Sequence, residues 1–84
     1  MKIIVWSKDN CPYCTAAFEL LDRTNLTYET RKIGDGWTRE QLLEAVPTAK
    51  TVPQIIIDKQ VIGGYNDLTS YMEDTGFNGT GWSL

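Results

Sequence analysis

The sequence predicts an α/β fold in which a four-stranded mixed sheet, in the order βαβ-α-ββα, is flanked by three helices. Residues 2–6 form a near-continuous apolar run, which is typical of a strand buried on both faces. Residues 12–23 have apolar side chains at helical spacing and lead to a second β-prone stretch, as in a parallel βαβ unit. Residues 54–62 read as two short apolar runs around a polar turn, which predicts an antiparallel hairpin.

The first helix has a clear predicted start. Pro12 suits the first helical position, where its missing N–H costs nothing, and this places Cys11 at the N-cap. We expect the helix to stop near Asn25 and the second strand to span 26–30, where β-prone residues alternate. The predicted core face of this helix is Ala17, Leu20, Leu21 and Thr24.

A short second helix is predicted after a glycine turn at 34–36. Thr38 and Gln41 fit a capping box that opens this helix, and Pro47 closes it. Its predicted inward residues are Leu42, Leu43 and Val46.

The C-terminal part is predicted to form a hairpin and a helix. Strands at 54–57 and 61–62 should pair antiparallel, followed by a helix capped by Asn66 or its neighbour and running to about Asp74. Gly76 is the predicted stop. The residues expected to pack from this helix are Leu68, Tyr71 and Met72. A sheet this small must be covered on both faces, so the predicted fold is thioredoxin-like.

Length and charge restrict the classes of function. We expect the 84 residues to form one domain, 1–84, with 77–84 as a loose tail, and to act as a monomer. A net charge of −3 gives no support for nucleic-acid or anionic-membrane binding. The chain has no apolar run of membrane-spanning length and no signal-like N-terminal segment, so we expect a cytoplasmic protein.

The chemistry centres on the only two cysteines, Cys11 and Cys14. Disulfide exchange requires a thiolate, and a thiol at a helix N-cap meets free N–H groups and the positive end of the helix dipole. Lys8 adds a positive charge on the same loop. Cys11 should therefore attack, and Cys14, one turn into the helix, should resolve the mixed disulfide. Pro12 stiffens the turn, and Tyr13 offers an exposed ring.

Two other interpretations of the cysteine pair stand beside this one. The pair could be buried and inert, although the preceding strand and Pro12 disfavour that. It could also be half of a metal site. Zinc takes four ligands, and the chain has no histidine and no further cysteine, so a metal or cluster would need carboxylates or a second chain.

Three segments together resemble the dithiol glutaredoxin family over nearly the full length of the chain. They are residues 8–14 (Lys-Asp-Asn-Cys-Pro-Tyr-Cys), 51–55 (Thr-Val-Pro-Gln-Ile) and 63–68 (Gly-Gly-Tyr-Asn-Asp-Leu). Thioredoxins are poorer matches, because they carry Gly-Pro between the cysteines and usually an extra leading strand and helix. The order and spacing of all three segments make the resemblance specific.

The resemblance implies a glutathione site around Cys11. In the family, the residue at Lys8 helps hold the glycine carboxylate, and a cis proline at Pro53 turns the backbone of Val52 toward the active cysteine. The helix start after the glycine pair would receive the γ-glutamyl carboxylate on free N–H groups, and Asp67 would accept from its ammonium group. The residues assigned to glutathione in this way are Lys8, Tyr13, Thr51, Val52, Pro53, Gly64, Tyr65, Asn66 and Asp67.

The sequence departs from the family pattern at several positions. Tyr65 and Asn66 stand where many glutaredoxins have a small residue followed by Asp, Ser or Thr, so Asn66 keeps hydrogen-bonding capacity without charge. Lys50 replaces a common arginine, and Trp6 a frequent tyrosine. None of these changes removes the cysteine chemistry. Without the cysteines, the glycine pair would be an ordinary turn and Asn66 an ordinary N-cap.

The function implied by the resemblance is glutathione-dependent reduction of protein disulfides and glutathione mixed disulfides. Ribonucleotide reductase is an implied protein partner, which would make the chain a hydrogen donor in electron transport and cell redox homeostasis. No permanently bound cofactor and no metal is expected, and glutathione is a co-substrate. The rivals are a glutaredoxin-like protein reduced by thioredoxin reductase and an iron–sulfur carrier that bridges two chains through Cys11; Pro12 and Cys14 disfavour the latter.

Overall fold

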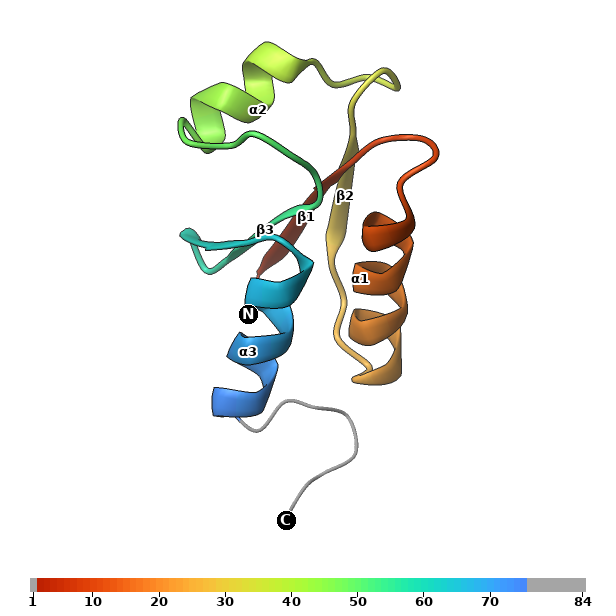
Figure 1. Ribbon diagram of the computed structural model, residues 1–84, viewed down its shortest axis with the longest axis vertical. Coiled ribbons are helices and arrows are strands. Elements are labelled where there is room, and N and C mark those ends of the chain that lie inside the picture. Colours follow the sequence, from red (N-terminus) through yellow and green to blue (C-terminus); the bar gives the residue numbers. More distant parts are fainter. Residues whose placement is uncertain (1, 76–84) are drawn as a thin grey trace.

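The computed structural model describes residues 2–75 and contains the predicted sheet and helices (Figure 1). The order of the four strands in the sheet is β2-β1-β3-β4. β1 is parallel to β2 and antiparallel to β3, and β3 is antiparallel to β4. The elements are β1 (Ile3–Ser7), α1 (Pro12–Arg23), β2 (Glu29–Lys32), α2 (Arg39–Ala45), β3 (Gln54–Ile57), β4 (Gln60–Gly63) and α3 (Tyr65–Thr75). The predicted βαβ-α-ββα order, mixed sheet and thioredoxin-like fold class are confirmed.

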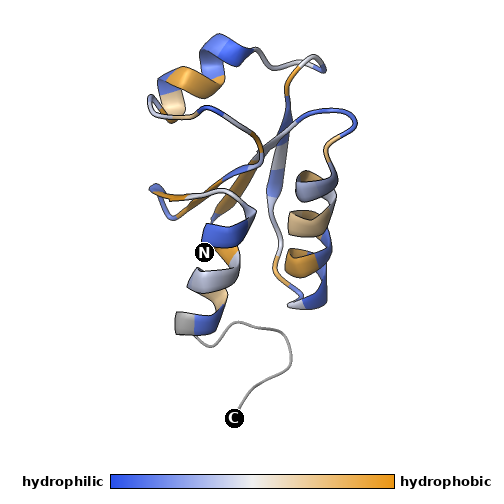
Figure 2. Cartoon of the chain, in the orientation of Figure 1, coloured by the Kyte–Doolittle hydropathy of each residue, from blue (hydrophilic) through white to orange (hydrophobic). Residues whose placement is uncertain are grey.

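Side-chain alternation on the two central strands divides the core into two clusters. Successive residues of a strand point to opposite faces of the sheet. Val5 of β1 and Ile55 of β3 belong to the cluster formed with α1 and α3, whereas Trp6 and Ile56 belong to the cluster formed with α2. Figure 2 shows hydrophobic residues along β1 and hydrophilic residues in the loop that leads from it into α1. The central strands are thus buried on both faces.

The second strand begins later than predicted. α1 ends at Arg23, and Asn25 turns the chain with a φ of +60°. The chain must then cross from the helix layer back to the sheet, so pairing with β1 begins only where Glu29 lies opposite Ile4. Thr24, predicted on the core face, is the half-buried C-cap residue instead.

The second helix has the predicted capping box, but one of its three predicted core residues is exposed. The Gln41 N–H donates to the Thr38 side chain, and the Thr38 N–H donates to the Gln41 side chain. Leu42 and Val46 are buried as predicted, but Leu43 is 40% exposed. Consecutive helical residues are about 100° apart around the axis, so a seven-residue helix that buries Leu42 and Val46 turns Leu43 toward solvent.

The last helix starts one residue before the predicted cap. α3 begins at Tyr65, and the Gly64 carbonyl accepts the first helical hydrogen bond, from the Leu68 N–H at 3.0 Å. The Asp67 carboxylate accepts from the Gly64 N–H at 3.1 Å. Gly64 therefore stands at the cap position that was predicted for Asn66 or its neighbour, because the Asp67 side chain satisfies its backbone.

The predicted packing residues of α3 can be compared with the structure, whereas its predicted stop lies beyond the described residues. Leu68 and Met72 are buried, and Tyr71 packs half-buried against the same cluster, as predicted. The predicted stop at Gly76 and the tail at 77–84 lie outside the described residues. Among residues 2–75, no helix is long and apolar enough to cross a membrane.

Candidate active site

The N-terminus of α1 holds the two cysteines as the sequence predicts. Cys11 is the N-cap residue with extended backbone, and Pro12 occupies the first helical turn. The Cys14 N–H donates to Cys11 Sγ at 3.2 Å, and the Thr15 N–H donates to the Cys11 carbonyl at 3.1 Å. The two cysteines form a disulfide, with Cα atoms 5.2 Å apart. The chain thus carries its cysteine pair as one closed unit at a helix start.

The two sulfurs differ in access and surroundings. Cys11 is half-buried, whereas Cys14 is only 2% exposed. No acidic residue lies in the first turn of α1, so no carboxylate there opposes a negative charge on sulfur. An incoming disulfide therefore reaches Cys11 first, and the N-cap geometry favours the thiolate at that sulfur.

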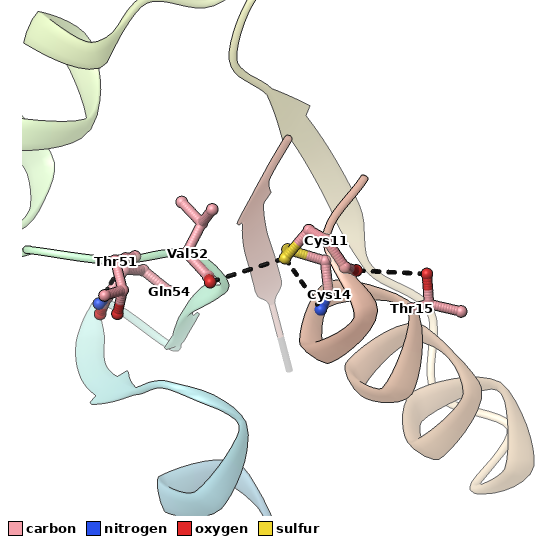
Figure 3. Close-up of a disulfide and its surroundings, with 6 residues drawn as sticks. All are labelled: Cys11, Cys14, Thr15, Thr51, Val52 and Gln54. Carbon is pink, nitrogen blue, oxygen red and sulfur yellow. Dashed lines mark hydrogen bonds between the residues drawn. A yellow bond between two sulfur atoms is a disulfide. The ribbon is translucent and has the colours of Figure 1, made fainter. Parts of the chain in front are cut away.

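A loop from the other half of the chain faces Cys11. The Val52 carbonyl oxygen lies 3.6 Å from Cys11 Sγ (Figure 3). In the disulfide this sulfur carries no hydrogen, so the approach becomes a hydrogen bond only when Cys11 is a thiol. The Val52–Pro53 peptide bond is cis and Pro53 is buried. The Gln54 side chain donates to the Thr51 carbonyl at 2.9 Å and braces this loop.

The start of α3 continues the surface formed by the loop. A Cβ built at Gly64 would lie 3.7 Å from the Pro53 carbonyl, which places the helix start directly beside the loop. Gly63 has a φ of +120°, and a Cβ there would collide with the Asp67 carboxylate. We call residues 51–53 together with 63–67 the facing wall.

An aromatic pair connects the facing wall with α1. The rings of Tyr13 and Tyr65 have centroids 6.1 Å apart and are tilted by 34°. Tyr13 is 64% exposed, more than any other large hydrophobic side chain among residues 2–75. This pair borders the disulfide on the side of the two helix starts.

The loop between β1 and α1 carries the charged groups of the site. Lys8 is exposed and lines two pockets, one shared with Cys11 and one shared with Val52. Asp9 forms an ion pair with Lys32 of β2, and its hydrogen bond and negative charge raise the pKa of Lys32. This exposed ion pair links the loop that carries Lys8 to the edge strand β2.

Most of the predicted site residues lie around the disulfide. Lys8, Tyr13 and Val52 lie next to it, and Pro53, Gly64 and Tyr65 belong with Val52 to the facing wall. Thr51 and Asn66 are exposed on that wall, and the hydrogen bonds of Cys11 Sγ involve Val52 and Cys14 rather than their side chains. The Asp67 carboxylate is occupied on one oxygen by Gly64, and this capping bond was not anticipated.

Two residues that shape the site, Gly63 and Lys32, are not predicted from the sequence. Gly63 carries the positive φ that lets Asp67 fold back, and the Gly-Gly pair was the available signal, although it did not say which glycine is required. Lys32 lies far from Asp9 in the sequence, and no local pattern indicates their ion pair. Within residues 2–75, no group of three or more His, Cys, Asp or Glu side chains gathers as a metal site would.

Comparisons with known proteins agree with this geometry. The glutaredoxin family model matches residues 3–62. The chain is 33% identical over 81 residues to glutaredoxin 1 of Escherichia coli K12, covering 88% of this chain and 95% of the relative. Its fold is similar to glutaredoxin 1 from Francisella tularensis complexed with cacodylate (TM-score 0.76, 26% identity, 88% and 94% of the two chains). It is equally similar to a buckwheat glutaredoxin–glutathione complex (TM-score 0.76, 26% identity, 87% and 69%).

Proposed function

The chain belongs to the glutaredoxin family and is a thiol–disulfide oxidoreductase, and from this premise we propose that glutathione supplies its electrons. We propose that Cys11 is the attacking sulfur and Cys14 the resolving one. The observation that carries the proposal is the half-buried N-cap sulfur of Cys11, which accepts the Cys14 N–H and faces the Val52 backbone.

The reaction consists of three exchanges. In the reduced protein, the Cys11 thiolate attacks one sulfur of a target disulfide; that S–S bond breaks and the other target sulfur leaves as a thiolate. Cys14 then attacks Cys11 in the mixed disulfide and releases the second target thiolate. Two glutathione molecules reduce the resulting Cys11–Cys14 disulfide and leave as oxidised glutathione. Each catalytic cycle thus moves two electrons from glutathione to the target, with no metal or bound cofactor in any step.

The facing wall supports glutathione as the ligand. An extended tripeptide can pair with the Val52 backbone as an added strand would, which is independent of side-chain identity. The first N–H groups of α3 lack helical acceptors and can receive the γ-glutamyl carboxylate. Asp67 gives one oxygen to Gly64 and keeps acceptor capacity for the ammonium group. Lys8 is exposed beside Cys11, where a glycine carboxylate can pair with it.

The electron source can be tested directly. Reduction of a small disulfide and of a glutathionylated peptide would be followed with glutathione plus glutathione reductase, or with thioredoxin reductase. We expect turnover with the first system and background rates with the second. Turnover with thioredoxin reductase alone would exclude the proposed electron source, and a brown, dimeric protein on purification would favour the iron–sulfur carrier.

The two proposed cysteine roles predict different activities for the two Cys→Ser variants. Cys11→Ser should lose all exchange activity, because no accessible thiolate remains. Cys14→Ser should keep the removal of glutathione from peptides and lose most reduction of intramolecular protein disulfides, because the mixed disulfide is no longer resolved internally. Measurement of both activities for both variants decides the assignment. An inactive Cys14→Ser with an active Cys11→Ser would invert the two roles.

We further propose ribonucleotide reductase as a protein substrate and the cytoplasm as the site of action. The family resemblance supports the first, and a cysteine pair suited to catalysis in a reducing compartment supports the second. Restoration of ribonucleotide reductase turnover by glutathione and this protein, compared with glutathione alone, tests the partner. Equal turnover with and without the protein would dismiss it.

A further inference from the structure

A pocket with no part in the mechanism above lies over the central strands, next to the β3–β4 turn. Its volume is about 470 Å³. We call it the β1–β3 pocket. It is lined by the apolar side chains of Ile4, Ala45 and Ile56 and by the charged side chains of Lys2, Arg31, Asp58 and Lys59. None of these residues belongs to the facing wall or is assigned to glutathione, so the pocket is separate from the site at the disulfide.

The floor of the β1–β3 pocket belongs to a row of aliphatic side chains across the sheet. Ile4 of β1 is the register partner of Ile56 of β3, and Ile56 is the partner of Val61 of β4. Directly paired residues project to the same face of a sheet, and Ile56 packs in the cluster formed with α2. The row therefore lies on the α2 face and spans two strand spacings, about 10 Å.

The second helix is too short to cover this row. α2 has seven residues and ends at Ala45, which is exposed beside the pocket. Ile4 is half-buried, and Val61 is 45% exposed. An apolar floor that stays open to solvent in a cavity of this size is typical of a site for a small ligand.

The charged groups of the β1–β3 pocket determine the sign of that ligand. Lys2 and Lys59 take part in no salt bridge among residues 2–75. Arg31 is paired with Glu29, and Asp58 is the one carboxylate in the lining. Three cations and these two carboxylates leave a surplus of one positive charge in a protein whose net charge is −3. The pocket thus suits a ligand with a single negative charge.

We propose that the β1–β3 pocket binds a small carboxylate that carries an apolar chain. The chain lies over Ile4 and Ile56, and the carboxylate meets the ammonium groups of Lys2 and Lys59. A cationic ligand is repelled by the same surplus charge, and a strongly polar ligand leaves the apolar floor without a partner. This inference goes beyond the proposed function and does not depend on it, because the two sites share no residue.

The test is an NMR titration of the oxidised, full-length protein with labelled isoleucine methyl groups. Octanoate is added at concentrations where it forms no micelles. We expect saturable shifts of the Ile4 and Ile56 methyl signals. Ile3 and Ile55 are the internal controls, since they pack in the cluster on the opposite face of the sheet and should shift little.

Three probes with the same chain separate charge recognition from apolar contact. They are octanoate, octan-1-ol and octylammonium. We expect octanoate to bind about fivefold more tightly than octylammonium, with octan-1-ol between them, which is the range expected for exposed charge pairs. The difference should shrink as the salt concentration is raised.

Two matched double variants locate the charge effect. Lys2→Gln/Lys59→Gln removes two cations of the pocket, and Arg39→Gln/Lys50→Gln removes two exposed cations outside it, so the net charge changes equally. We expect the first variant to bind octanoate and octan-1-ol equally and the second to keep the preference for octanoate. Unchanged methyl signals of Ile3 and Ile55 without ligand confirm that both variants are folded.

The opposing outcomes are distinct. Shifts that do not saturate, or equal affinities for octanoate and octylammonium, would overturn the proposed site. Shifts of Ile4 and Ile56 that follow protein concentration without ligand would show that a second copy of the chain covers the row instead. Competition between octanoate and glutathione would place octanoate at the disulfide and likewise overturn the inference. Saturable binding of octanoate to a protein that glutathione cannot reduce would leave the inference standing and remove only the proposed electron source.

Discussion

The two sides of the disulfide are built in different ways. On the helix side, Cys11 is held by contacts three and four residues away, from the Cys14 and Thr15 N–H groups. On the facing wall, the Val52 carbonyl reaches Cys11 Sγ across 41 residues of sequence. The helix side sets the reactivity of the sulfur, and the facing wall sets what can approach it. Changes to one side should therefore leave the property of the other largely intact.

The largest expected effect comes from a matched pair of core variants. Leu21 of α1 and Leu68 of α3 are both 0% exposed and belong to the same cluster. Leu21→Ala and Leu68→Ala should each lower the free energy of unfolding by about 2–5 kcal/mol, through lost burial and a residual cavity. Chemical denaturation of the oxidised proteins measures this loss.

The two core variants should differ in glutathione use. Leu68→Ala loosens the helix that carries the facing wall, so we expect its KM for a glutathione mixed disulfide to rise several-fold. Leu21→Ala should keep a KM near that of the wild type at a temperature where both variants are folded. Equal KM values for the two variants would contradict the view that the facing wall, and not the helix side, controls glutathione binding.

A smaller loss of stability is expected when a glycine of the facing wall is replaced by alanine. Gly63→Ala should destabilise the protein by roughly 1–3 kcal/mol, because φ is positive there and the new Cβ collides with Asp67. Gly64→Ala is the control, since its Cβ would meet only the Pro53 carbonyl at ordinary contact distance. Thermal unfolding of both variants measures the difference. A more damaging Gly64→Ala would show that the conformation of Gly63 is not what holds the turn.

The smallest change in stability is expected when the exposed ion pair between Asp9 and Lys32 is removed. Because Asp9 raises the pKa of Lys32 above its ordinary value of 10.5, the pair stabilises the fold at neutral pH, and this contribution is lost as the pH rises through the raised pKa of Lys32. Asp9→Asn should return that pKa toward its ordinary value. Titration of the Lys32 side chain by NMR in the oxidised protein, where no thiol titrates, checks the direction. An identical titration in both proteins would show that the pair does not persist in solution.

Local chemistry explains which elements the sequence predicts well. Pro12, the Thr38 and Gln41 capping box and the 54–57 strand each follow from rules that act within a few residues, and each is present. Local patterns predicted the wrong start for β2 and a buried Leu43. Both features depend on where other elements lie: β2 starts at Glu29, and Leu43 is exposed. The cap of α3 was misplaced for the same reason, since Gly64 is satisfied by the folded-back side chain of Asp67.

The sequence by itself determined the fold class, the family resemblance and the reactive end of the site. A cysteine followed by proline at a helix start has its hydrogen bonds and dipole set by its immediate neighbours. Only the tertiary structure decided that the Val52 carbonyl stands 3.6 Å from Cys11 Sγ and that Ile4, Ile56 and Val61 form one row across the sheet. Those relations join residues from separate elements of the chain, and only the packing of the sheet and helices brings them together.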